Sequence, residues 1–457
     1  MKAIPSLKHQ EQSFTYRHYL YLAIPLIISG ISTPLLGAVD TAVIGQMGDA
    51  SAIGGVAVGA VIFNTMYWLL GFLRVSTSGF TAQADGANNK NETMLALLRP
   101  AIIAIVVGLL FIVLQKPILQ IALAVIGGNE SVSGFAADYF SIRIWGAPFL
   151  LLSYVIIGWL IGLGKVRLSL STQIIMNMLN IGLDFLFVLQ FEMGVVGVAY
   201  ATVISEVLAV GLGILLILYS KGLTLSSITG KMIFDIESVK KMFRMNRDLF
   251  LRTVCLLTMT VLFTSKAASM GDTVLAANAI LLQIHYIIAY FFGGFANASS
   301  IVVGRSIGSN NYSLYRKAYI LSAQSGLMAA VVLSTCLYIF DDFIISMFTT
   351  SPEVVSLVHN YLVWMLIFPF VGFWALQLEG IFSGATEARA IRDGIFFSLL
   401  LFLVALWYLA PYGNDGLWIA FLLFSIGRSL FLSLFIKKVT QVHFNPVDKT
   451  NSKKEIS

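Results

Sequence analysis

The sequence predicts an all-α polytopic membrane protein, with twelve transmembrane helices in two six-helix lobes related by an internal parallel repeat. Hydrophobic residues make up 58% of the 457 residues and charged residues only 11%, whereas soluble domains carry about 25% charged residues. Apolar runs of roughly 20 residues recur along the chain, and each is long enough to span the hydrocarbon core as a helix. The alternating pattern of a transmembrane β-barrel does not occur in these runs.

The apolar segments, taken in order, predict twelve spans separated by polar connections. The change from apolar to charged residues, or to Gly, Pro and Asn, delimits each segment. An even number of spans places both termini on the same side of the membrane. The predicted spans are residues 18–44, 52–77, 93–115, 133–160, 168–190, 194–219, 244–268, 274–303, 316–339, 354–382, 394–411 and 415–436.

The basic residues predict which side carries the termini. Of the 29 Lys and Arg residues, 23 fall on the face of the termini, four lie within helices, and the opposite loops hold only Lys116 and Lys266. Because cytoplasmic loops carry an excess of Lys and Arg, both termini are predicted to be cytoplasmic, in a bacterial or archaeal inner membrane. The net charge of +6 is thus a topology signal and does not indicate a nucleic-acid partner.

A weak internal repeat predicts the domain organisation. We expect an N-terminal lobe over residues 1–219, a cytoplasmic linker over 220–242, a C-terminal lobe over 243–439 and a cytoplasmic tail over 440–457. Six helices per lobe make the copies parallel repeats, and such folds place the substrate site between the halves. Three motifs recur at an offset of 222 or 223 residues: Met47-Gly48-Asp49 and Met270-Gly271-Asp272, Gly86-Ala-Asn88-Asn89 and Gly308-Ser-Asn310-Asn311, and Gly158-x-x-x-Gly162 and Gly380-x-x-x-Gly384.

A carboxylate stands inside the first predicted span. Asp40 lies in a long run with no other charged residue, where an ionised Asp at mid-membrane costs roughly 2.5–3.5 kcal/mol. Pro25 and Pro34 each remove a backbone donor from the same helix, and such residues allow a helix to bend. We therefore predict that Asp40 has a functional role on a helix that Pro25 and Pro34 allow to bend.

A second set of polar residues accompanies Asp40 in the first lobe. Asn180 and Asp184 are four residues apart and so share one helix face, where they can bind one ion or one proton. Thr202 and Tyr139 add two further oxygens. This hard-oxygen set suits H⁺ or Na⁺ and indicates no metal cofactor, since transition metals prefer His or Cys. The structural alternative is that the acids are satisfied by neighbouring hydroxyls and amides and hold the bundle together.

The predicted chemistry belongs to the first half alone. Adding the repeat offset to Asp40, Asn180, Asp184 and Thr202 reaches only apolar residues, which are Phe263, Phe402, Leu406 and Phe424. In the second half, buried Arg252 and Arg428 are expected to pair with a carbonyl or an acid, and Glu379 to lie near a helix end with its carboxylate at the interface.

Motifs of enzymes are not found in the sequence, so we predict a protein that is not an enzyme. It contains no P-loop and no HExxH. Gly304-Arg-Ser306-Ile-Gly308 has the GxSxG spelling, but it follows a membrane helix instead of a strand, so it is interpreted as a loop. Transport without a nucleotide-binding domain would have to depend on an ion gradient.

These residues resemble those of the multidrug and toxic compound extrusion (MATE) transporters, and the resemblance covers nearly the whole chain. Two segments resemble the DinF-like branch: Asn246-Arg-Asp-Leu-Phe-x-Arg252-Thr253 and Gly384-Ala-Thr386. The second half does not carry the extra acids of the NorM-like branch. The motifs shared with the whole family are Pro34-x-x-x-x-x-Asp40-Thr-x-x-Ile-Gly45, Gly86-Ala-Asn-Asn, Asn180-x-x-x-Asp184 and Gly380-x-x-x-Gly384-Ala-Thr-x-Ala-Arg389.

The resemblance implies a pair of lobes in a V that exports small organic cations or amphipathic drugs in exchange for H⁺, with Na⁺ as second choice. Asp40, Asn180, Asp184 and Thr202 match the family's coupling-ion cluster, and Tyr139 matches more loosely. We expect a functional monomer in a lipid bilayer. The alternative is a lipid-linked oligosaccharide flippase, which would need a cationic cavity, but the few membrane arginines and the acids of one lobe favour the antiporter.

Overall fold

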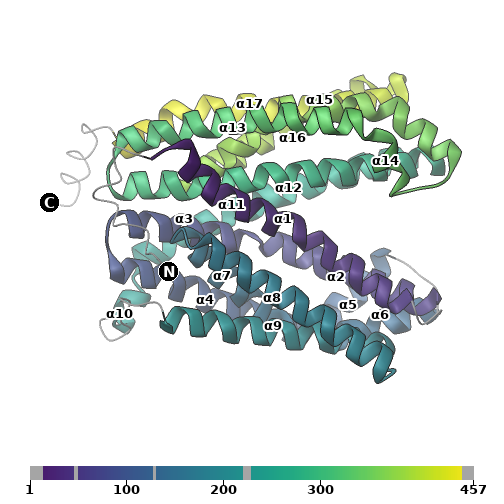
Figure 1. The fold of residues 1–457 in the computed structure, drawn as a ribbon, viewed down its shortest axis with the longest axis horizontal. Helices are drawn as coiled ribbons and strands as arrows, with labels where there is room; N and C mark the ends of the chain where they lie inside the picture. Colours follow the sequence, from purple (N-terminus) through teal and green to yellow (C-terminus); the bar gives the residue numbers. More distant parts are fainter. Residues whose placement is uncertain (1–13, 46–49, 127–129, 220–227, 445–457) are drawn as a thin grey trace. The chain divides into compact units, whose positions relative to one another are not determined.

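The computed structural model describes residues 14–45, 50–126, 130–219 and 228–444, and the side chains at 33–42, 45, 50 and 219 are not among those described. Within these ranges the chain is almost entirely helical and contains no strand (Figure 1). Eleven helical segments there are long and apolar enough to cross a membrane. Helix α1 (Tyr16–Gly45), with 30 residues, adds the twelfth. The predicted fold class is confirmed.

The described residues form two compact units. The N-terminal unit comprises Ile31–Asp85 and Asn89–Met242, and the C-terminal unit comprises Met1–Gly30, Gly86–Asn88 and Phe243–Ser457. The first contains the second half of α1 together with α2 (Ala50–Leu70), α3 (Phe72–Gly86), α4 (Lys90–Val113), α5 (Gln115–Ile126), α6 (Glu130–Arg143), α7 (Ala147–Gly162), α8 (Val166–Asp184), α9 (Gly194–Tyr219) and α10 (Gly230–Ile233). The second contains the first half of α1, most of α11 (Ile236–Ala268), and α12 (Asp272–Gly308), α13 (Tyr312–Ile339), α14 (Asp341–Ser346), α15 (Pro352–Gly384), α16 (Ala388–Tyr408) and α17 (Gly413–Phe444).

Two glycines bring α7 against α3 in the N-terminal unit. A Cβ atom on Gly158 would clash with the backbone carbonyl oxygen of Arg74, and one on Gly162 would clash with that of Ser78. The Gly-x-x-x-Gly spacing therefore allows two helix backbones to approach more closely than any larger residue would permit.

The C-terminal unit repeats this contact with different helices. A Cβ on Gly380 would meet the carbonyl oxygen of Ala296, and one on Gly384 would meet that of Ser300, so α15 packs closely against α12. All four positions follow their N-terminal counterparts by 222 residues, the offset that the sequence motifs predicted. The internal repeat is thus present in the packing of each unit as well as in the sequence.

The turns before α4 and α13 repeat as well. Asn88 and Asn310 both have φ of 54°, a left-handed conformation that Asn adopts more readily than most residues. The next residue caps the following helix in each case: the side-chain oxygen of Asn89 accepts from the backbone N–H of Glu92, and that of Asn311 accepts from Leu314. The asparagine pairs are therefore turn and capping residues.

Some helix ends differ from the sequence prediction. The span predicted to begin at 244 begins at Ile236, because its first two turns carry charged residues that an apolar pattern does not detect. The span predicted to end at 77 continues through α3 to Gly86, with a break at Gly71. Ser306, interpreted as a loop residue, lies inside α12, where its hydroxyl donates to the carbonyl oxygen of Val303 at 2.7 Å.

Within the predicted linker, α10 is held against α4. Arg99 on α4 donates from Nε to the carbonyl oxygen of Ile233 at 3.3 Å and from NH2 to that of Met232 at 2.8 Å. Its NH1 pairs with Glu92 at 3.0 Å. A guanidinium is well suited to the last carbonyls of a helix, which carry partial negative charge.

Candidate functional site

Helices α8 and α9 bring together two of the predicted site residues. Asn180 on α8 donates from Nδ2 to Oγ1 of Thr202 on α9 at 3.4 Å, and that hydroxyl donates to the carbonyl oxygen of Val198 at 2.9 Å. Asn180 is 1% exposed and its Oδ1 accepts no hydrogen bond among the described residues. Buried amide oxygens are nearly always hydrogen-bonded, so Oδ1 is an acceptor suited to a bound proton donor or cation.

Asp184 lies one helical turn beyond Asn180 and is fully buried. It is the last residue of α8, and the next six residues, Phe185–Gln190, continue as a π-helix. π-helical turns are rare and occur frequently at functional sites, because the wider turn redirects side chains and backbone groups. A local departure from α-helical geometry therefore coincides with the predicted carboxylate.

Helix α1 carries the remaining acid and both prolines of the prediction. The backbone is α-helical from Tyr16 through Pro25 and Pro34 to Asp40 and Gly45. The side chains of Pro34 and Asp40 lie outside the described residues. The structure therefore places Asp40 on the part of α1 that belongs to the N-terminal unit and leaves its contacts, like the bending of the helix, as predictions.

Tyr139 belongs to a second buried polar group in the same unit. Its hydroxyl accepts a hydrogen bond from NH1 of Arg143 at 2.7 Å. The guanidinium carbon of Arg143 lies 4.8 Å from the ring centroid of Phe63 and 5.5 Å from that of Tyr139. Two aromatic faces and one hydroxyl thus stabilise a positive charge in the interior.

Glu206 completes this group and was not among the predicted site residues. It lies on α9 one turn beyond Thr202, is 3% exposed, and interacts electrostatically with Arg143 and Tyr67. The signal was available in the sequence, because Glu206 is the one acid of the apolar segment 194–219, as Asp40 is of the first span. Arg143 was recognised only as a basic residue within a helix.

In the C-terminal unit, one buried acid is shared by two arginines. Glu379 on α15 accepts from Arg252 on α11 at 2.6 Å and, with its other oxygen, from Arg428 on α17. Glu379 is 7% exposed, so the expectation that its carboxylate reaches the interface is wrong. The two arginines pair with an acid as predicted, and the triad joins three helices.

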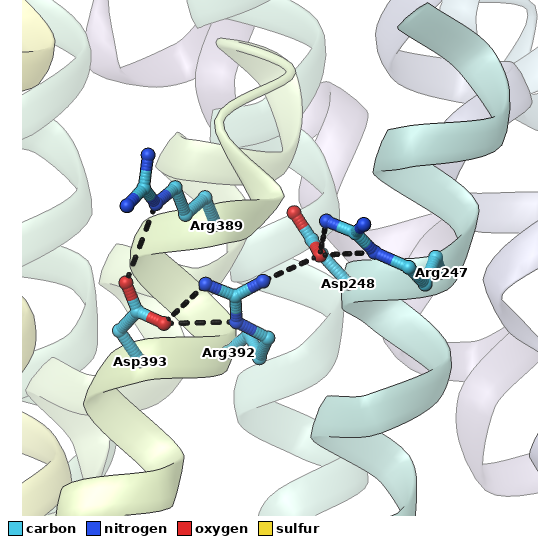
Figure 2. A network of polar contacts seen from close by, with 5 residues as sticks. All are labelled: Arg247, Asp248, Arg389, Arg392 and Asp393. Atoms are coloured by element: carbon cyan, nitrogen blue, oxygen red, sulfur yellow. Dashed lines mark hydrogen bonds and ion pairs between the residues drawn. The ribbon is translucent and has the colours of Figure 1, made fainter. Parts of the chain in front are cut away.

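A second ionic network joins α11 to α16 (Figure 2). Asp248, 2% exposed, accepts from NH1 of Arg392 at 2.8 Å and from Arg247 at 2.8 Å. Arg392 also donates to Asp393 at 2.6 Å, and Arg389 lies 3.7 Å from the same carboxylate. The Asn-Arg-Asp-Leu-Phe-x-Arg segment therefore supplies Arg252 to the first network and Arg247 and Asp248 to the second, and both networks fix α11.

Comparisons with known proteins agree with the internal repeat and the helical fold described above. The MatE family model matches residues 25–186 and again residues 249–409, one match for each half of the repeat. The chain is 35% identical to DNA damage-inducible protein F of Escherichia coli strain K12 over 415 residues, which cover 90% of each chain. It is 20% identical to a probable multidrug resistance protein NorM of Oceanobacillus iheyensis over 398 residues, covering 85% of this chain and 86% of the other.

A solved structure shows the same fold. It is described as the outward-facing conformation of a multidrug resistance MATE family transporter of the MOP superfamily. The two chains superimpose with a TM-score of 0.85 at 19% identity, covering 96% of this chain and all of the other. Two family-model matches, a relative similar over nine-tenths of its length and a shared twelve-helix fold lead to one conclusion: the chain belongs to the MatE family of multidrug and toxic compound extrusion transporters, in its DinF-like branch.

Proposed function

We propose that the protein is a secondary-active efflux antiporter that exports cationic or amphipathic organic compounds in exchange for H⁺, with Na⁺ as second choice. The observation that carries the proposal is the buried polar set on α8 and α9, in which fully buried Asp184 lies one turn from the Asn180–Thr202 contact. An acid in such surroundings is expensive as an ion, and intramembrane acids usually mark ion or proton pathways.

The coupling follows from competition for negative charge. An ionised Asp184 or Asp40 stabilises a cation in the cavity of the N-terminal unit, and a proton on the carboxylate removes that stabilisation. Proton and cationic substrate therefore weaken each other's binding by the same factor. At a ratio of one proton to one monovalent cation the exchange would be electroneutral, and the pH gradient alone would drive it, at about 1.4 kcal/mol per pH unit.

Each predicted residue has a role in this scheme. Asp40 and Asp184 bind the coupling ion, Asn180 and Thr202 supply neutral oxygens that could complete a Na⁺ shell, and Tyr139 borders the cavity. Pro25 and Pro34 allow α1 to bend when Asp40 changes charge. The protein acts as a monomer in the cytoplasmic membrane, with both termini on the cytoplasmic side.

Neutral variants of the two acids test the assignment. In proteoliposomes with an imposed pH gradient, Asp40→Asn and Asp184→Asn should each reduce transport of tetraphenylphosphonium by at least tenfold, because neither amide can exchange a proton. Asp138→Asn is the matched control, since Asp138 is an exposed acid of the same unit. Wild-type transport across the pH range in both variants, with normal elution on size-exclusion chromatography, would refute the carboxylate mechanism.

A further inference from the structure

Glu206 is a buried acid for which the proposed mechanism has no role. Its Oε2 accepts no hydrogen bond among the residues that the structure describes. The carboxyl is packed so closely onto Gly146 that a Cβ atom there would clash with Oε2. A carboxylate in apolar surroundings is costly unless it is hydrogen-bonded, paired or neutralised. Glu206 can meet this requirement either as an ion facing Arg143 or by binding a proton.

The groups around Glu206 are compatible with both its ionised and its protonated state. Arg143 on α6 is its charged neighbour, Tyr67 on α2 is a titratable neighbour, and Tyr139 and Tyr154 lie close enough to interact electrostatically with Tyr67. The hydroxyl of Tyr139 and the ring of Phe63 hold the guanidinium of Arg143 from other directions. Arg143 therefore keeps its place whether Glu206 is charged or neutral.

Glu206 also stands in a fixed relation to the α8–α9 polar set. Asn180 contacts Thr202 across a short connection, so the two helices run antiparallel. Asp184 then lies one turn to one side of this contact and Glu206 one turn to the other, and two turns correspond to roughly 11 Å along the axis. The two acids flank the amide and hydroxyl pair.

We propose that Glu206 is a further proton-binding group of the transport cycle, beside Asp40 and Asp184, and that Arg143 is its internal counter-ion when the proton leaves. The inference rests on the proposed proton exchange and adds a residue to it. Protonation of Glu206 makes the net charge around Arg143 more positive by one unit, which disfavours a cationic substrate nearby. With Glu206 ionised, its negative charge offsets that of Arg143, and a cation can bind nearby. The guanidinium also disfavours Na⁺ at this acid, which leaves the proton as its ligand.

Proton release on substrate binding tests the proposal without transport. Purified protein in a weakly buffered detergent solution is titrated with tetraphenylphosphonium, and the protons released per bound cation are counted across the pH range. Glu206→Gln should lose up to one released proton per cation, whereas Glu206→Asp should restore it. Ser205→Ala is the matched control, because Ser205 is buried beside Glu206 and bonds only the Ala201 carbonyl within its own helix.

A glycine variant gives an independent measurement if Glu206→Gln does not fold. Gly146→Ala keeps the carboxyl but displaces it, so the pH at which half the protons are released should shift while their total number stays. Release by Glu206→Gln equal to the wild type, or an unshifted pH dependence in Gly146→Ala, would overturn the role of Glu206. If wild-type protein released no proton on binding, proton exchange itself would fail and Glu206 with it.

Discussion

At the scale of single residues, several of the described charges within the helices are held by partners. The guanidinium of Arg143 meets a tyrosine hydroxyl and two rings, and Arg252 and Arg428 share Glu379. A buried ion pair adds little net stability compared with apolar residues, but removing one partner leaves a charge without compensation. The effect of a substitution on stability therefore depends on whether it leaves a buried charge without its partner.

Glu379→Gln should destabilise the protein strongly, because it leaves the buried guanidinium of Arg428 and the half-buried one of Arg252 without a counter-charge. Losing one partner of a buried pair costs about 3–5 kcal/mol, which should lower the thermal unfolding midpoint in detergent by several degrees. Glu353→Gln, at an exposed acid in the first turn of the same helix, is the matched control. Equal midpoints for the two variants would show that the triad does not stabilise the fold.

The same pairs mark a limit of sequence reasoning at the residue scale. Glu379 is 127 residues from Arg252 and 49 from Arg428, and no periodicity connects positions so far apart. Asn180 and Thr202 could be grouped, because neighbouring helices joined by a short turn pack together. Glu206 could have been identified by the rule applied to Asp40, because an acid inside an apolar run is costly and usually functional.

At the scale of helices, close backbone contacts decide which elements adjoin. The glycine pairs on α7 and α15 each face a helix backbone, and the spacing of 222 residues shows that one contact was duplicated. In a membrane, where lipid is as apolar as the side chains, such packing is a main source of helix association.

Alanine at these glycines should therefore destabilise both units. Gly158→Ala and Gly380→Ala each place a Cβ against a carbonyl oxygen and should cost about 1–3 kcal/mol by overpacking. Gly211→Ala on α9 is the control, since no atom lies within 4 Å of its added Cβ; better helix propensity should leave it unchanged or slightly more stable. Thermal unfolding of the three variants in one detergent provides the comparison, and equal midpoints would contradict the backbone-contact account.

Helices could be predicted from the sequence where a long apolar run marks them. The apolar segments of the described helices were found, and the repeat was visible in short motifs. Helix α5, with no buried residue, and the polar start of α11 were missed because neither presents a long apolar run. The π-helix after Asp184 also left no composition signal, since Phe185–Gln190 is as apolar as an α-helix in the same place.

At the scale of the whole molecule, a duplicated fold carries buried polar residues that are not duplicated. Phe263, Phe402 and Phe424, three of the counterparts of the predicted site residues, are each at most 1% exposed in the C-terminal unit. That unit instead contains ionic networks that fix α11, so the copies share packing and differ in buried charge. We accordingly propose that proton exchange takes place in the N-terminal unit.

Orientation in the membrane can be checked with cysteine labelling. In a background with Cys255 and Cys336 replaced by Ser, a membrane-impermeant maleimide should label Lys116→Cys on intact cells and Arg316→Cys only after permeabilisation. The positive-inside distribution of Lys and Arg is the physical reason, and both positions are exposed. The reverse labelling pattern would invert the proposed topology.

The central claim is that a proton, bound by buried acids of the N-terminal unit, is exchanged for an organic cation. The most direct measurement uses right-side-out proteoliposomes loaded with tetraphenylphosphonium at zero membrane potential, with a pH gradient and a sodium gradient imposed in separate experiments. Acid outside should drive efflux of the cation, and sodium outside at uniform pH should drive little. Efflux driven by sodium alone and indifferent to the pH gradient would contradict the account.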